Sequence, residues 1–199
     1  MRWDKLFDDL ETQLERELTA EEVDLEAEEE RLRLGRLSLR DRLVSLHGAQ
    51  QRASEYSLAV TLVNGDRLRL HPVAFGRDWL SADIVDDSSR RSHCILPLAA
   101  IGGLSLSAPQ VVASLRPTAE PGHPALSERL GLPFVLRDLC RRRRSLDLLH
   151  AGVVLHGTID RVGRDHVDLA VHEPGSARRD SAVSEHRVVP LANLLLVRL

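Results

Sequence analysis

Hydrophobic and polar residues follow two different periods along this chain, and the change of period divides it. Residues 3–34 contain no Pro or Gly and are dense in Glu, Leu, Ala and Arg, so they predict a helix. From about Ser57 onward, apolar residues occupy every second position, which is the period of half-buried strands. The fold class is therefore expected to be α+β, with an amphipathic helix first and strands after it.

Leucines recur at every seventh residue along and beyond the helix, which is the period of a coiled-coil seam. They are Leu18, Leu25, Leu32, Leu39 and Leu46. Two interpretations stay open: the row pairs with a partner or a second copy, or it packs on the chain's own body. Gly35 threatens to break the helix. Because Ser38 and Asp41 fit a capping box, a new helix is expected to start there.

The alternating region predicts two similar sets of strands. The first set covers residues 58–62, 68–70, 79–85 and 94–98, with a hairpin turn at Asn64-Gly65-Asp66. The second set covers residues 146–149, 153–162, 167–171 and 188–197. Each half is expected to hold about five strands. A sheet of five short strands leaves two open edges, and curling into a small barrel would remove them.

A repeated sequence supports this division. Phe75-Gly76-Arg77-Asp78-Trp79-Leu80 returns 87 residues later as Val162-Gly163-Arg164-Asp165-His166-Val167, and His93–Ala99 returns as His186–Ala192. The prediction is two tandem five-stranded barrels, each preceded by a short helix. The expected boundaries are a helix over 1–37, a first barrel over 38–107, a Pro-rich linker over 108–125 and a second barrel over 126–199.

The second half resembles the Sm-like family, and more loosely the SH3-like small barrels. The resemblance rests on the glycine-turn motif Leu149–Val162, the loop His166-Val167-Asp168-Leu169 and the closing strand Val188-Val189-Pro190-Leu191. It covers residues 126–199 well and residues 38–106 weakly. The resemblance implies base recognition by the loop, in which His166, and Trp79 in the first half, would stack on bases.

Two departures from that family put its RNA pocket in doubt. Asp168 stands where the family has Asn, and a carboxylate accepts hydrogen bonds but repels phosphate. The Arg-Gly step of the family's second motif is also missing. Separately, the opening residues Met1–Glu11 are similar to the start of an uncharacterised family of actinobacterial cytosolic proteins, which implies no mechanism.

Charge is unevenly distributed along the chain. Residues 1–46 hold 14 acidic and 8 basic side chains, a net of −6, so the remaining 16 acidic and 19 basic give +3. A body this weakly basic does not indicate a dedicated duplex-DNA binder. The run Arg141-Arg142-Arg143-Arg144 has two interpretations: it grips phosphates, or it ends a helix that begins near Phe134, where cations suit the helix dipole.

Signals for catalysis, metal or cofactor binding are weak. The nine histidines include the pairs His150 with His156 and His166 with His172, but neither pair has a further ligand at a recognised spacing. No nucleophile motif surrounds Cys94 or Cys140, so both are expected to be packing residues. The composition predicts no enzyme, no cofactor, no metal and no small-molecule substrate. Two cysteines, no signal peptide and no spanning segment favour a soluble, cytoplasmic protein without membrane contact.

The sequence therefore favours a non-enzymatic cytosolic adaptor. Its small barrels and acidic helix would bind another protein, and residues 1–46 would carry partner binding or self-association. The alternative is an RNA or single-stranded nucleic-acid binder that uses Trp79, His166 and the arginine run.

Overall fold

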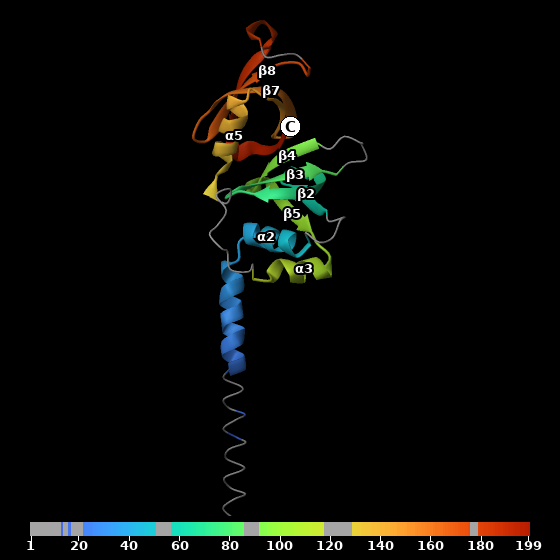
Figure 1. Ribbon diagram of the computed structural model, residues 1–199, viewed down its shortest axis with the longest axis vertical. Helices are drawn as coiled ribbons and strands as arrows, with labels where there is room; N and C mark the ends of the chain where they lie inside the picture. Colours follow the sequence, from blue (N-terminus) through green and yellow to red (C-terminus); the bar gives the residue numbers. More distant parts are fainter. Residues whose placement is uncertain are drawn as a thin grey trace, which may run out of the picture. The chain divides into compact units, whose positions relative to one another are not determined.

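The protein is described by a computed structural model that places residues 13, 16, 22–50, 57–85, 92–117, 129–175 and 179–199 (Figure 1). The chain divides into two compact units, residues 1–38 and residues 39–199. The position of one unit relative to the other is not determined, so each is described separately.

Residues 22–36 of the first unit are helical, as are the described positions 13 and 16. Exposed ion pairs one turn apart support the helix, with Arg31 Nη1 at 3.3 Å from Glu28 and Arg33 Nε at 2.6 Å from Glu30. The hydrogen bond to Arg33 keeps the pKa of Glu30 below its ordinary value. The helix stops at residues 37 and 38, close behind Gly35, and the next begins at Leu39. The helix break expected at this point is confirmed.

Five strands form the first half of the second unit. They are β1 (Leu58–Leu62), β2 (Arg67–Phe75), β3 (Trp79–Ile84), β4 (Ser92–Pro97) and β5 (Ile101–Ser105). The predicted hairpin turn between β1 and β2 is confirmed: Gly65 has φ +93°, and Asn64 Nδ2 donates to Asp66 at 2.8 Å. Strand β5 was not predicted individually, because its Gly102-Gly103 pair gives a weak strand pattern.

The second half repeats this arrangement. Its strands are β6 (Ser145–His150), β7 (Val153–Val162), β8 (His166–Val171), β9 (Glu185–Pro190) and β10 (Leu194–Arg198). Ala151 and Gly152 both have positive φ, so a two-residue turn of the primed type joins β6 to β7. The prediction of one closing strand over 188–197 is wrong, because the 3₁₀ turn η3 (Leu191–Asn193) separates β9 from β10.

All ten strands belong to one open antiparallel sheet, in the order β5-β1-β2-β3-β4-β10-β6-β7-β8-β9. The prediction of two tandem five-stranded barrels is therefore wrong. Each half removes one open edge by pairing with the other half, since β4 pairs with β10, and neither half closes on itself. The strand order within the halves nevertheless matches, with β5-β1-β2-β3-β4 corresponding to β10-β6-β7-β8-β9.

The two hydrophobic cores lie on opposite faces of this sheet where the halves meet. Cys94 and Leu96 of β4 pack in the first core, whereas Ile95 between them packs in the second. Ile95 pairs with Val197, which belongs to the second core, and the neighbouring Leu196 belongs to the first. Because side chains alternate between faces along a strand, the face that is buried in one half is the outer face in the other.

Helices close both cores (Figure 1). Helix α2 (Leu39–Gln50) buries Leu43 and Leu46 in the first core and packs against α3 (Ala108–Leu115). Helix α5 (Leu132–Arg141) covers the second core, where Leu136 is fully buried. Helix α3 occupies the start of the segment 108–125 for which a linker is predicted, and Pro109 sits in its first turn, where Pro is tolerated. Residues 118–128 lie outside the described residues.

Candidate interaction surfaces

The seam between β4 and β10 joins the two halves of the sheet. Ile95 faces Val197 and Cys94 faces Arg198, and the Leu199 amide donates to the His93 carbonyl at 2.8 Å. Ile95 is 3% exposed and Val197 is fully buried. The seam is therefore short, and an apolar pair at its centre is shielded from water.

Strand β9 is the counterpart of β4 in the second half, but it forms an outer edge. The repeated tail aligns Ile95-Leu96-Pro97 with Val188-Val189-Pro190. Val189 is fully buried, as Leu96 is, whereas Val188 is 63% exposed although Ile95 is only 3% exposed. No described strand pairs with the outer side of β9. The residue that the seam buries in the first half is thus left open in the second.

Charged residues flank Val188 on this edge. Arg187 makes two contacts with Glu185, from Nε at 2.8 Å and from Nη2 at 3.0 Å. His186 Nδ1 lies 3.9 Å from Asp160. Charged side chains on an edge strand limit indiscriminate pairing with other strands. Any strand that pairs with β9 must therefore match these charges as well as cover Val188.

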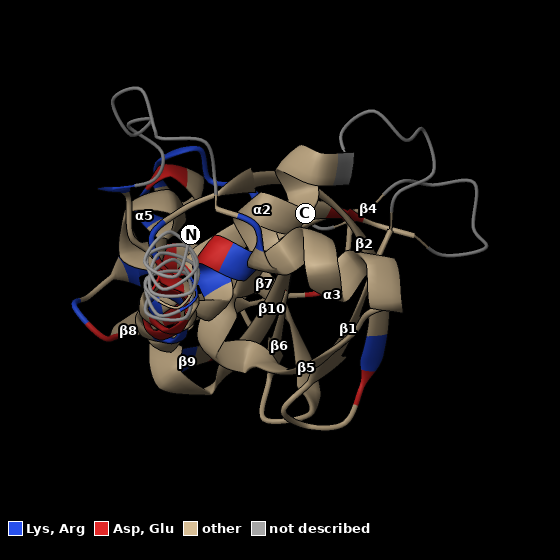
Figure 2. Cartoon of the chain, turned by 90° about the horizontal axis from the view of Figure 1, so that it is seen from below, with Lys and Arg blue, Asp and Glu red and all other residues tan. Residues whose placement is uncertain are grey.

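A second surface is a shallow cleft of about 530 Å³ beside the start of α5. Its lining residues are Arg77, Gly131, Pro133, Phe134, Arg137, Val162, Gly163 and Arg164. Arg77 and Arg164 come from the repeated Gly-Arg-Asp turns, so equivalent positions of the two halves line one cleft. Figure 2 shows basic residues on and next to α5. We call this surface the α5 cleft.

The arginines of the α5 cleft are only partly neutralised. Arg77 Nη2 lies 3.7 Å from Asp78, whose other oxygen accepts the Leu132 amide at 2.7 Å and so caps α5. Among the described residues, Arg137 Nη2 reaches only the Gly163 carbonyl, at 3.4 Å. Arg164 is exposed and makes no ion pair with a described residue. The sequence pattern does not predict this cleft, although the repeated turn contains both Arg77 and Arg164.

The arginine run that the sequence singles out ends α5. Arg141 Nη2 and Arg142 Nε lie 3.1 and 2.7 Å from the carboxylate of Asp138, and Arg143 Nη1 lies 3.1 Å from Asp160. Arg143 has φ +51°, and Arg144 follows it as an exposed residue before β6. Three of these four charges therefore have a carboxylate partner within the described residues, and they do not converge on one site.

Trp79 and His166, at equivalent positions, each pack a ring against the glycine of their turn. A Cβ at Gly76 would lie 2.1 Å from Trp79 Nε1, and one at Gly163 would lie 2.5 Å from His166 Cε1. Trp79 is 7% exposed and its Nε1 donates to the Leu130 carbonyl at 2.9 Å, so its faces are not open to a base. The His166 side chain remains 44% exposed.

Carboxylates lie close to exposed side chains in the second Gly-Arg-Asp turn and along β8. His166 Nδ1 lies 2.8 Å from Asp165, and this hydrogen bond holds the pKa of Asp165 below its ordinary value. Asp168 lies 3.6 Å from Arg161 Nη1 and pairs with Val188 across β8 and β9. Asp168 thus belongs to the surroundings of the β9 edge.

The leucines of the seven-residue repeat differ in burial, so they do not form one continuous exposed surface. Leu25, Leu32 and Leu39 are 62%, 54% and 39% exposed, whereas Leu46 is fully buried in the first core. Leu18 lies outside the described residues. The exposed part of the row on the first unit is therefore limited to Leu25 and Leu32 within the described helix.

Histidines pair with carboxylates and with each other, but not as the sequence pattern suggests. His93 lies 3.0 Å from Asp83, and His156 lies 2.6 Å from Asp147. The His156 ring packs against His172 with centroids 5.2 Å apart, and His172 is 3% exposed. Among the described residues, no group of three or more His, Cys, Asp or Glu side chains could hold a metal ion.

The buried cysteine of β4 is not suited to nucleophilic chemistry. Burial raises the pKa of the Cys94 thiol to about 12, so this cysteine is a poor nucleophile.

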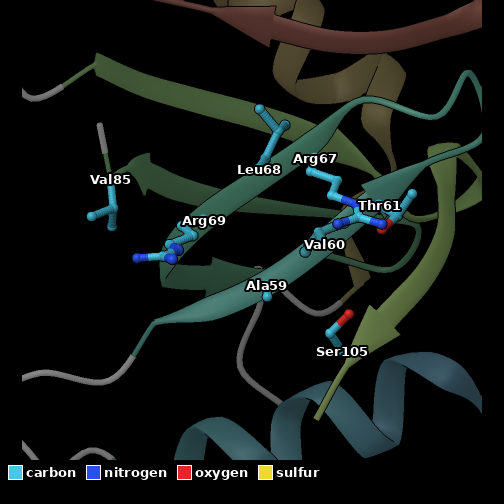
Figure 3. A pocket seen from close by; sticks show the side chains of 8 residues that line it. All are labelled: Ala59, Val60, Thr61, Arg67, Leu68, Arg69, Val85 and Ser105. Carbon is cyan, nitrogen blue, oxygen red and sulfur yellow. The ribbon is translucent and has the colours of Figure 1, made fainter. Parts of the chain in front are cut away.

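A groove of about 540 Å³ lies along β1, β2 and β5 (Figure 3). In Figure 3, Arg67 lies next to Thr61, while Arg69 points away from both. Among the described residues, no carboxylate lines this groove.

Comparisons do not assign the chain to a group of known proteins: no family model, no curated protein and no solved structure matches it. The Sm-like resemblance therefore stays a prediction. No helix within the described residues is long and apolar enough to cross a membrane.

Proposed function

We propose that this protein is a non-enzymatic, cytosolic adaptor that binds another protein by accepting a strand of that protein at the β9 edge. The observation that carries the proposal is the contrast between Val188, 63% exposed, and its counterpart Ile95, 3% exposed where β4 pairs with β10. Addition of a strand to a sheet edge is a common mode of peptide recognition, in which main-chain hydrogen bonds supply affinity and side-chain pockets supply specificity.

The seam also indicates what the partner strand should look like. Val197 covers Ile95, so a partner needs an apolar residue opposite Val188, and full burial of such a side chain contributes about 1.5–3 kcal/mol. Arg187 takes the place of Cys94, which faces Arg198 in the seam. A partner therefore needs an acidic residue where β10 has Arg198, because two arginines opposite each other would repel.

The acidic helix supplies the second contact of the adaptor. Leu25 and Leu32 are more than half exposed on a helix whose described part, residues 22–36, carries six acidic and three basic side chains. Exposed leucines within an acidic face suit a partner that combines apolar and basic groups. The partner at this helix is a second protein or a second copy.

The experiment uses a labelled peptide that copies β10. Residues 193–199 with Arg198→Glu are titrated with the full chain, and fluorescence anisotropy reports binding. We expect Val188→Asp to weaken binding at least about tenfold, because a carboxylate replaces the apolar contact. Val73→Asp is the control, since Val73 is 55% exposed on β2, an inner strand. Equal binding by wild type and Val188→Asp would contradict the proposal.

Hydrogen exchange gives a second measurement of the same contact. Addition of a strand should slow exchange of the outward-facing amides of β9 and leave those of the opposite edge strand β5 unchanged.

The nucleic-acid alternative lacks comparable support, because Trp79 is enclosed and the arginine run is mostly paired.

A further inference from the structure

The α5 cleft, lined by residues of both halves, presents positive charge around an apolar centre. Phe134 is 49% exposed, and the guanidinium groups of Arg77, Arg137 and Arg164 line the same cleft. No carboxylate belongs to its lining within the described residues. Exposed aromatic surface bordered by arginines is typical of a binding surface, since the ring supplies contact area and the guanidinium groups supply charge. The ligand should therefore be both anionic and amphipathic.

The described helix of the first unit has the complementary pattern. Leu25 is 62% exposed, and Glu22, Glu28 and Glu29 lie three or four residues from it, which places them on the same face. An apolar side chain bordered by three carboxylates thus matches an aromatic ring bordered by three guanidinium groups. Over the whole chain the same division holds, with net −6 in residues 1–46 and +3 in the remainder.

We propose that the acidic helix, residues 22–36, of one copy docks into the α5 cleft of a second copy. Such a contact joins two different surfaces, so one copy can bind a second without using its own cleft. It is also distinct from strand addition at β9, and neither proposal depends on the other. A nucleic acid is the competing anionic ligand, and the test is designed to separate it.

Sedimentation equilibrium of the full chain tests the contact. At about 50 mM salt, where the screening length exceeds 10 Å, the average mass should rise above 22.2 kDa with protein concentration. At about 500 mM salt it should fall back to the monomer mass, because exposed charge pairs are screened. A mass of 22.2 kDa at every concentration in low salt would overturn the proposal.

Charge reversal identifies the surfaces. Arg137→Glu with Arg164→Glu should weaken association at least about tenfold, and Glu28→Arg with Glu29→Arg should do the same. These side chains are exposed, so the fold should persist, and thermal unfolding checks it. Combination of the two reversed sets should restore association, because each charge again faces its opposite. Arg69→Glu, in the groove along β1, β2 and β5, is the matched control and should change nothing.

Other outcomes would overturn the contact. Association that survives reversal of the cleft but is lost in Leu25→Glu would indicate pairing of two helices instead. Tight binding of a single-stranded oligonucleotide that needs Arg137 and Arg164, without self-association, would assign the cleft to nucleic acid. Val188→Asp should leave self-association unchanged, so failure of the β9 proposal and failure of this one can be told apart.

Discussion

Strands β4 and β9 occupy the same place in the two halves of the sheet, yet their surroundings differ. In β4, Ile95 pairs with β10 and is buried in the second core, and in β9 the equivalent Val188 faces solvent. The inward neighbours Leu96 and Val189 are fully buried in both halves. A repeated sequence thus reproduces the core contacts, which are local to each half. It does not reproduce the edge, which depends on the position of the half in the strand order.

The test of this contrast with the largest expected effect on stability places a carboxylate at both positions. Ile95→Asp should lower the free energy of unfolding by about 3–5 kcal/mol, because it buries an unpaired charge in the seam. Val188→Asp should change it by less than about 0.5 kcal/mol, because its side chain already meets water. Urea unfolding of both variants provides the measurement. Equal losses would mean that β9 is covered in solution.

The aromatic rings of the two Gly-Arg-Asp turns give the next test. Trp79→Ala should cost about 3 kcal/mol, since it removes a ring that packs in the second core and donates to Leu130. His166→Ala should cost less than about 1 kcal/mol, because the imidazole is nearly half exposed. Thermal unfolding compares the two. A small effect at Trp79 would show that the ring contributes little to joining the halves.

Two glycines on inner and outer strands extend the comparison to the backbone. A Cβ at Gly157 of β7 would lie 2.3 Å from the Ala170 carbonyl oxygen, so Gly157→Ala should cost about 2 kcal/mol. Gly103 of β5 has no atom within 4 Å of its Cβ position. Gly103→Ala should therefore be neutral or slightly stabilising, by up to about 1 kcal/mol. Urea unfolding midpoints test both, and a harmless Gly157→Ala would show that β8 can shift.

The smallest expected effect is a pH dependence of stability that originates at a histidine of α2, one of the helices that cover the cores. Burial lowers the pKa of His47 of α2, whose ring packs edge-on against Phe75. The unfolded chain therefore binds the proton first as pH falls below about 6.5, and stability declines from there down to the lower folded-state pKa. His47→Gln should remove this part of the pH dependence between about pH 7.5 and pH 5.5. Urea midpoints at both values measure it, and an unchanged slope in the variant would exclude His47 as the cause.

The local parts of this fold could be predicted from the sequence. Strand β7 occupies residues 153–162 as expected, because its alternation and the Ala151-Gly152 turn are properties of neighbouring residues. The helix break before Leu39 is local in the same way. The boundary between β9 and β10 could not be predicted, since the apolar run 188–197 continues through the 3₁₀ turn.

Long-range contacts set the limit of prediction, for the fold and for the candidate sites alike. Pairing of β4 with β10 joins residues about a hundred positions apart, and no periodicity encodes it. The enclosure of Trp79 depends on the Leu130 carbonyl, and the exposure of Val188 depends on a missing neighbour strand. The cleft arginines Arg77 and Arg164 were visible as a repeat, but only the placement of α5 brings them to one surface.

The exchange of buried faces at the seam makes the sheet two-sided. On the face away from its own core, each half carries a His–Asp pair across neighbouring strands. The pairs are His93 with Asp83 and His156 with Asp147. The two pairs therefore lie on opposite faces of one sheet, so a substitution at one pair changes one face of the molecule and leaves the other intact.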